Sequence, residues 1–78
     1  MQYYPEQAHE FVVCIENSSY LAALEVGKIY PVLPDSDATM MQMIRIIDES
    51  GEDYLYAADY FLSIDVPQPI QVALRKAA

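Results

Sequence analysis

The chain has 78 residues, and its 12 acidic and 4 basic side chains give a formal net charge of −8. This length suits one small domain with a modest core, and a hydrophobic content of 54% with seven Tyr excludes a disordered acidic chain. Twelve acids against only Lys28 and Arg45 precede Pro67, a balance of −10 that excludes nucleic acid and anionic lipid as partners.

Local composition excludes other classes of protein. No apolar stretch approaches the ~20 residues of a membrane span, and the first residues lack the basic region and apolar run of a signal peptide, so we expect a cytoplasmic location. Cys14 is the only cysteine and lies in an apolar run, which indicates a core thiol. The only histidine, His9, lies in the N-terminal arm, so no pair of nucleophile and base is predicted. We therefore expect no enzyme activity and no cofactor.

The middle of the chain predicts five short strands joined by tight turns. Runs rich in β-branched, aromatic and other apolar residues alternate with Gly, Pro, Asn, Asp and Ser turn signals. Short strands without a long central helix are typical of a small barrel. We expect an all-β domain over 11–66, an N-terminal arm at 1–10 and a C-terminal tail at 67–78. The predicted strands cover 11–16, 28–33, 40–47, 53–56 and 61–66.

Four local signals refine this prediction. Pro31 lacks a backbone N–H, so the second strand should expose that position at a sheet edge. Residues 34–37 are expected to form a turn. Gly51 is available for positive φ in the turn between the third and fourth strands. Residues 57–60 suit a single helical turn.

The tail predicts a short amphipathic helix over 70–77. Apolar residues at Ile70, Ala73, Leu74 and Ala77 share one side of it, and Pro69 can occupy its first turn. Eight residues are too few for a stable helix in water, so we expect this side to dock on the domain or on a second copy.

Strand alternation also predicts the core. Met40, Met41 and Met43 open the third strand and are expected to fill the core, whereas an exposed cluster of them would suggest a partner surface. The side chains expected to supply most of the buried apolar area are Phe11, Val13, Ile15, Val26, Ile29, Ile46, Leu55, Leu62 and Ile64.

Two stretches resemble the Src-homology-3 (SH3) family. Residues 24–33, Leu-Glu-Val-Gly-Lys-Ile-Tyr-Pro-Val-Leu, resemble its diverging turn, and residues 54–61, Tyr-Leu-Tyr-Ala-Ala-Asp-Tyr-Phe, resemble its Gly-Tyr-Ile-Pro-Ser-Asn-Tyr-Val segment. The resemblance covers residues 11–66 and implies a small five-stranded SH3-like barrel. Stretches such as Gly-Lys-Ile-Tyr and Asp-Glu-Ser-Gly-Glu-Asp-Tyr-Leu-Tyr are also similar to a set of small bacterial proteins, which implies the same fold and no particular activity.

The resemblance also implies a groove for extended peptides, which SH3 domains line with aromatic side chains. Tyr60 stands at the position of the groove tyrosine, whereas Ala57 replaces the groove proline and Leu55 replaces a common groove aromatic. The chain has no Trp, on which that groove is centred, so ordinary polyproline binding is not predicted. In the family, acidic loops beside the groove select Arg and Lys in the ligand.

Five acids crowd residues 48–59, around the turn at Gly51 and the helical turn that follows. We expect a basic, extended partner segment to contact Glu49, Glu52, Asp59 and Tyr60, which would make the chain a non-catalytic protein-interaction module. Two alternatives are open: a structural subunit of a homo-oligomer closed by the arm or tail, and a small acidic calcium-binding protein. A solvated surface that only keeps the chain in solution would explain the same charges.

Overall fold

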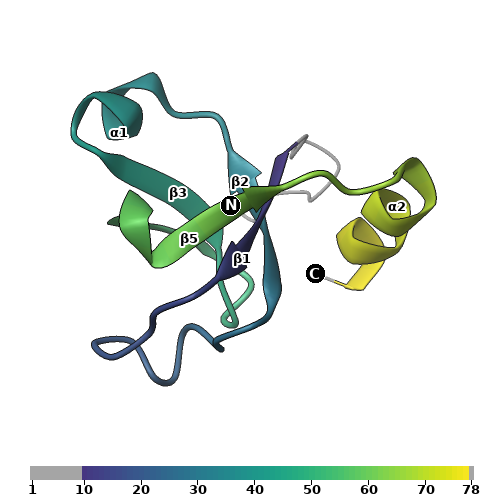
Figure 1. Ribbon diagram of the computed structural model, residues 1–78, viewed down its shortest axis with the longest axis horizontal. Coiled ribbons are helices and arrows are strands. Elements are labelled where there is room, and N and C mark those ends of the chain that lie inside the picture. The colour runs from purple at the N-terminus through teal and green to yellow at the C-terminus, as the bar shows by residue number, and fades with distance from the viewer. Residues whose placement is uncertain (1–9, 78) are drawn as a thin grey trace.

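The computed structural model describes the backbone of residues 10–77 and the side chains of residues 10–74. The predicted N-terminal arm, apart from Glu10, lies outside the described residues. The strands are β1 (Glu10–Cys14), β2 (Ile29–Leu33), β3 (Met43–Ile47), β4 (Asp53–Ala57) and β5 (Phe61–Ile64). The helices are α1 (Ser36–Met40), the 3₁₀ turn η2 (Ala58–Tyr60) and α2 (Gln68–Ala77), as Figure 1 shows.

All five strands belong to one antiparallel sheet with the order β4-β3-β2-β1-β5. The expected five strands are therefore confirmed, as are the helical turn before β5 and the C-terminal helix. The sheet curves around its core, and η2 connects the two edge strands, β4 and β5 (Figure 1). Within residues 10–77 no ladder pair joins β4 to β5, so the sheet is not a closed barrel.

Pro31 lies in the middle of the sheet, and the prediction of an edge position was wrong. β2 is the central strand, and Pro31 is buried opposite Phe11 of β1. The pairs between β2 and β3 begin only at Val32, directly after the proline. Cys14 N donates to Lys28 O, so Cys14 and Lys28 form a hydrogen-bonded pair between β1 and β2. Hydrogen-bonded and non-hydrogen-bonded pairs alternate along an antiparallel ladder, which makes Phe11 and Pro31 a non-hydrogen-bonded pair. The nitrogen of Pro31 therefore points away from β1, toward the β3 side of the strand, at a position that β3 does not pair. The missing donor therefore breaks no ladder bond.

The predicted turn at 34–37 is the start of α1, and the third strand begins at Met43 and not at Met40. Asp35 caps this helix, since its Oδ1 accepts a hydrogen bond of 3.0 Å from Ala38 N. The helix ends at Met40, and Gln42 then takes a φ of 58° before β3 starts. The sequence signal for this helix is the capping aspartate, a residue type that favours turns as well as helix N-caps.

The main core occupies one face of the sheet, which we call the inner face. Its members alternate along the strands, and Cys14 is fully buried among them, which confirms the core thiol. Leu24 from the β1–β2 loop covers this face. The buried cluster consists of Val12, Cys14, Leu24, Tyr30, Val32, Ile46, Tyr56 and Phe61.

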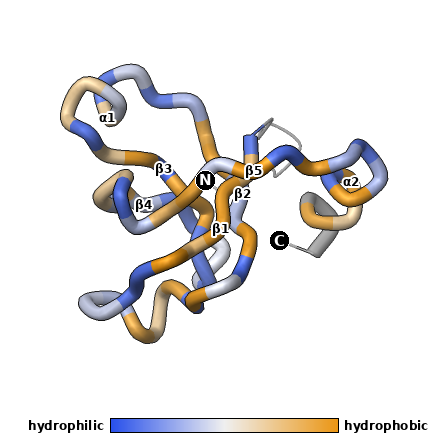
Figure 2. The backbone as a smooth tube through the Cα atoms, in the orientation of Figure 1, coloured by the Kyte–Doolittle hydropathy of each residue, from blue (hydrophilic) through white to orange (hydrophobic). Residues whose placement is uncertain are grey.

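The prediction of the core chose the wrong face of the sheet. Most of the predicted core residues lie on the face opposite the inner face, which we call the outer face. The register places Phe11 opposite Pro31 and Ile64, and Val13 opposite Ile29 and Leu62, all on that outer face. Figure 2 shows β1 as an almost uninterrupted hydrophobic stretch, so period-two alternation could not choose between the two faces. Of the nine predicted core residues only Phe11 and Ile46 are buried, whereas Ile15, Val26 and Leu62 are exposed.

We expect Gly51→Val to lower the free energy of unfolding by about 1–2 kcal/mol. Gly51 has a φ of 81°, which confirms the predicted positive value, and a Cβ added there would meet no atom within 4 Å. The loss would thus reflect backbone strain alone. Urea unfolding measures it, and Gly51→Asn serves as the control because Asn tolerates the left-handed region better. Equal midpoints for Gly51→Val and the unmodified chain would contradict this assignment.

Candidate functional site

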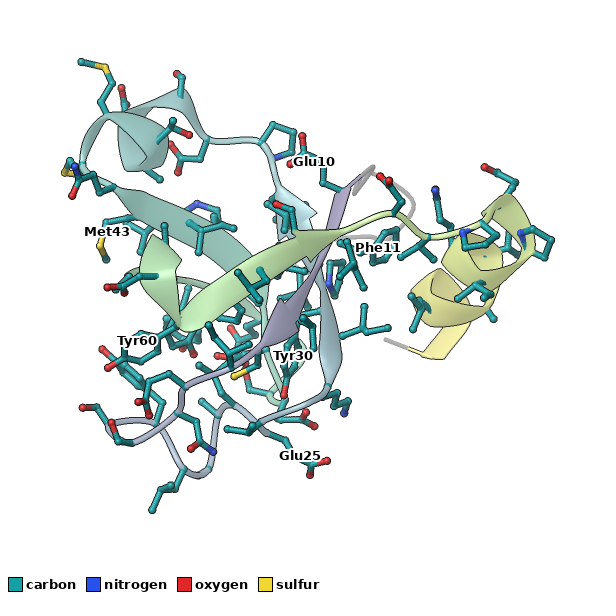
Figure 3. The ribbon with its side chains drawn as sticks, in the orientation of Figure 1. Glu10, Phe11, Glu25, Tyr30, Met43 and Tyr60 are labelled. Carbon is teal, nitrogen blue, oxygen red and sulfur yellow. The ribbon has the colours of Figure 1, made fainter. Side chains whose placement is uncertain are left out.

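A contact between the exposed Tyr20 and the half-buried Tyr60 marks the surface where η2 meets the β1–β2 loop. The ring of Tyr20, 41% exposed, lies edge-on to Tyr60 with centroids 6.0 Å apart and to the buried Tyr56 at 4.9 Å. Ile15 N donates a 2.8 Å hydrogen bond to Tyr60 O, which fixes η2 against the end of β1. Ile15, which is bonded to Tyr60 through its backbone, and Leu21, which follows Tyr20 in the chain, are both exposed. We call Ile15, Tyr20, Leu21 and Tyr60 the aromatic patch, and Figure 3 shows Tyr60 on the side of the molecule where the β1–β2 loop lies.

The β1–β2 loop that carries Tyr20 is held by its own hydrogen bonds. Tyr20 N donates to Asn17 O, and Leu24 N donates to Tyr20 O. The side chain of Asn17 donates to Leu24 O at 2.9 Å, which closes the loop over the inner face. Tyr20 is therefore presented by a structured turn, although its residues carry no regular secondary structure.

Two acids border the aromatic patch. Asp59 in η2 is exposed, and Glu16 follows Ile15 in the chain. Ser18 N donates a 2.9 Å hydrogen bond to Glu16 Oε1, and this bond holds the pKa of the Glu16 carboxyl below its usual value. Within residues 10–74 neither Asp59 nor Glu16 forms an ion pair, so both charges face solvent.

The hairpin acid Asp48 serves the fold and does not face a partner. It is 6% exposed and accepts hydrogen bonds from the N–H and hydroxyl of Ser50 and from the Tyr56 hydroxyl. Burial of Tyr56, together with this bond to a carboxylate, raises the pKa of its hydroxyl well above the usual value. The tyrosine therefore stays protonated and keeps donating at any physiological pH.

Glu49 ties the hairpin to β2 and to the β1–β2 loop. Its carboxylate accepts from Lys28 Nζ at 2.7 Å and from the Tyr30 hydroxyl at 2.5 Å, and its backbone N–H donates to Ala23 O. These two side-chain donors, Lys28 first, hold the pKa of Glu49 below its usual value. Burial and the same carboxylate raise the pKa of Tyr30. The charge of Glu49 is thus already compensated inside the molecule.

The four predicted site residues lie in two places, at opposite ends of β4. Glu49 and Glu52 belong to the β3–β4 hairpin, whereas Asp59 and Tyr60 belong to η2. Among the described residues Glu52 and Asp59 are exposed without an ion pair, and Tyr60 is half-buried against Tyr20. The structure joins Tyr60 to Tyr20, a residue that sequence reasoning did not select because residues 20–24 had no clear pattern.

A shallow hollow of about 410 Å³ lies on the other side of η2, between α1 and the sheet. Ala58 of η2 lines it together with Val32, Met43 and Ile44, and Ala58 N donates to Gln42 O at 3.0 Å. Met40 and Met41 are exposed at the end of α1. Of the three methionines only Met43 lines this hollow and is partly buried, so the prediction that all three fill the core was wrong for Met40 and Met41.

Arg45 of β3 forms two ion pairs. Arg45 on the outer face donates to Asp35 at 2.8 Å and to Asp53 at 2.6 Å, which joins the α1 cap to β3 and β4. The backbone N–H of Ala38 and then Arg45 hold the pKa of Asp35 low. Lys28 and Arg45 are the only basic residues before Pro67, so the acids left unpaired give the surface its negative charge.

Comparisons with protein-family models, with curated proteins and with solved structures found no match. Over residues 10–77 no helix has the length and apolar composition that a membrane crossing requires. In the same part of the chain no three His, Cys, Asp or Glu side chains are grouped so as to hold a metal ion. A functional proposal for this chain therefore depends on its own side chains and their arrangement.

Replacing Tyr56 by Phe should lower the free energy of unfolding by about 1–3 kcal/mol, because the buried Asp48 carboxylate loses a donor that nothing replaces. Tyr54→Phe is the matched control: Tyr54 lies two residues earlier in the same strand with its side chain 52% exposed. We expect this control to stay within about 0.5 kcal/mol of the unmodified chain. Chemical denaturation of both variants would refute the role of Asp48 if they behaved alike.

Acid should weaken the fold partly through Glu49. Its folded pKa lies below the ordinary value of 4.5, so its contribution to stability is complete above that value and is lost as pH falls through the folded pKa. We expect unfolding free energies measured between about pH 5 and pH 3 to fall less steeply for Glu49→Gln than for the unmodified chain. Glu52→Gln, which removes an exposed acid of the same hairpin, is the matched control for the loss of one charge. Identical slopes for Glu49→Gln and the unmodified chain would show that Glu49 carries no such linkage.

Proposed function

We propose that this chain is a non-catalytic protein-interaction module that binds a basic, extended segment of a partner at the aromatic patch. The observation that carries the proposal is the solvent-facing contact between Tyr20 and Tyr60, bordered by the unpaired acids Glu16 and Asp59. Tyrosines supply large amphipathic contact area and are enriched among the residues that dominate binding energy. A neighbouring carboxylate adds preference for Lys or Arg.

The arrangement of the strands supports an SH3-like fold as part of this proposal. β1 lies between β2 and β5, the strands β2, β3 and β4 follow one another, and a single 3₁₀ turn joins β4 to β5. The resemblance places Tyr60 at the position of the groove tyrosine. The β1–β2 loop brings Tyr20 against it, and Ala58 of the same 3₁₀ turn lines the hollow beside α1.

The chemistry of the surface favours a basic ligand over a proline-rich one. An Arg guanidinium can stack on an exposed tyrosine ring while its charge faces Asp59, and such contacts are worth about 0.5–1 kcal/mol at exposed sites. Apolar residues of the same segment would contact Ile15, Leu21 or Met43 in the hollow. The absence of Trp from the chain removes the side chain on which SH3 domains centre polyproline recognition.

The net charge of −8 supports long-range attraction of a basic segment. Exposed acids at the margin of an interface mainly set the association rate, and salt screens them. Glu52 on the hairpin would act in this way, whereas Glu49 is committed to Lys28 and Tyr30. We thus assign Asp59 and Tyr60 to direct contact and Glu52 to steering.

A binding role is favoured over a catalytic one because the two adjacent hairpin acids already have partners. Asp48 is saturated by Ser50 and Tyr56, and Glu49 by Lys28 and Tyr30. Neither carboxylate is free to exchange protons with a substrate. The proposal also places the chain in the cytoplasm, where a lone thiol such as Cys14 stays reduced.

The test uses labelled extended peptides of alternating Arg and Pro residues, with Glu and Pro peptides as the reference, and fluorescence anisotropy of the full chain. Asp59→Asn should weaken binding by about threefold to tenfold, and Tyr60→Ala by at least about tenfold. Asp65→Asn is the matched control because it removes the same charge from an exposed position at the end of β5. Binding to the unmodified chain should also weaken as salt rises.

Equal effects of Asp59→Asn and Asp65→Asn would reduce the interaction to non-specific attraction by net charge and would overturn the proposed site. Binding of the Glu and Pro peptides with equal affinity would overturn the preference for basic segments. Because Tyr60 packs against Tyr20, the folded state of Tyr60→Ala is checked by its urea midpoint, and Tyr60→Phe provides a milder variant with the same ring packing.

A further inference from the structure

The apolar side of α2 is largely open in a single copy of the chain. Ile70, Ala73 and Leu74 lie at helical spacing on one side of α2, yet Ile70 is 47% exposed and Ala73 is also exposed. At its start, Ile70 N and Gln71 N donate to Pro67 O, and the Gln71 side chain donates to Val66 O, so these bonds join α2 to its own linker. Figure 1 shows α2 standing beside the sheet, joined to it by the segment after β5.

The outer face of the sheet is the apolar surface nearest to α2. Leu74 lines a hollow of about 170 Å³ together with Ile29, Pro31 and Ile47, all of which belong to the outer face. A second hollow of about 430 Å³ is lined by Gln71 of α2 and by Phe11 and Ile64 of the same face. Figure 3 shows Phe11 pointing from β1 toward the side where α2 lies. Both hollows therefore lie between α2 and the outer face, where Phe11, Pro31 and Ile47 are themselves buried.

The outer face also continues beyond the region beside α2. Leu62 of β5, opposite Val13, is 56% exposed, and Val13 is only partly buried. Leu55 of β4 is partly buried on the same face. A domain that leaves both an apolar helix side and an apolar sheet face part-open has two surfaces of matching chemistry.

The distribution of charge selects the occupant of these surfaces. Residues up to Val66 carry −10, whereas residues 67–78 contain no acid and carry Arg75 and Lys76. Two copies repel each other through their domains, but the α2 segment of one copy is attracted to the domain of another. A ten-residue helix is also too short to be stable in water without packing, so closer burial of its apolar side would stabilise it.

We propose that the chain forms a two-fold symmetric dimer in which α2 of each copy packs its Ile70 side on the outer sheet face of the other. The arrangement uses the same two surfaces twice, as an isologous interface requires. It covers Leu62 and Val13 of the sheet together with Ile70 and Ala73 of the helix. The inference does not rest on the peptide site, because the aromatic patch lies at η2 and the β1–β2 loop and contributes no residue to this interface.

Sedimentation velocity of the full chain, from micromolar to millimolar concentration, tests the dimer. The mass should rise from 8.9 kDa toward twice that value as concentration increases. Two pairs of variants test the proposed interface. In each pair, one variant adds a Glu inside the interface and the other adds a Glu outside it. Ile70→Glu is paired with Val72→Glu, which lies on the opposite side of α2. Leu62→Glu is paired with Ser63→Glu, its neighbour on the other face of β5.

Ile70→Glu and Leu62→Glu should each raise the dissociation constant at least about tenfold, since each buries an unpaired carboxylate. Val72→Glu and Ser63→Glu should leave it within about threefold. If circular dichroism shows that Ile70→Glu loses the helix, Ile70→Ala replaces it, because Ala favours helix while removing the apolar contact.

A mass of one chain at every concentration would overturn the dimer. Dimerisation unaffected by Leu62→Glu would mean that the helices pack on each other and would overturn the proposed arrangement, as would equal disruption by Val72→Glu and Ile70→Glu. Peptide binding by Ile70→Glu should stay unchanged, so failure of the dimer and failure of the peptide site are separate results.

Discussion

The buried carboxylate of Asp48 is the constraint on which the arrangement of the candidate site depends. A charge removed from water needs donors, and the Ser50 N–H, the Ser50 hydroxyl and the Tyr56 hydroxyl provide them. These bonds hold the β3–β4 hairpin over the core, where Glu49 reaches Lys28 and Tyr30, and its N–H reaches Ala23 O. The β1–β2 loop is thereby fixed, and Tyr20 of that loop is placed against Tyr56. The position of Tyr20 against Tyr60 at the surface therefore depends on the buried carboxylate of Asp48.

Strand positions could be predicted from the sequence, because short apolar runs between turn residues leave few alternatives. The inner and outer faces could not be distinguished, since β1 is Phe-Val-Val-Cys after Glu10 and both faces of the sheet are apolar. The covering elements decide between them: Leu24 packs into the inner-face cluster, whereas the outer face is covered only in part, with Phe11 and Ile47 buried and Leu62 exposed. The helix at Ser36–Met40 was missed for a different reason. Asp and Ser favour both turns and helix caps, and only the bond from Ala38 N to Asp35 separates the two.

Within the candidate site, Asp59 and Tyr60 were accessible to sequence reasoning because they lie in a segment with family resemblance. Tyr20 was not, because its contact with Tyr60 joins residues forty positions apart in the chain and no local pattern encodes such a pairing. The acids near Gly51 show the reverse difficulty. In the sequence they form one acidic group, but in the fold Asp48 is buried, Asp53 pairs with Arg45, and Glu52 alone of these three keeps an open charge. Acidic composition thus exaggerates the charge available to a partner.

The pairing of β2 has a consequence for how so short a chain encloses a core with one sheet. β2 pairs with β1 along Ile29–Val32 but with β3 only at Val32 and Leu33, so the two ladders share a single residue of the strand. Because Pro31 has no backbone N–H, the ladder between β2 and β3 cannot extend from Val32 toward the start of β2. Where the two ladders do not overlap, β1 and β3 are not both bonded to the same residues of β2. The sheet can therefore bend sharply along β2, which divides it into two parts. The part formed by β5, β1 and β2 then faces the part formed by β2, β3 and β4, and one continuous sheet supplies both walls of the core.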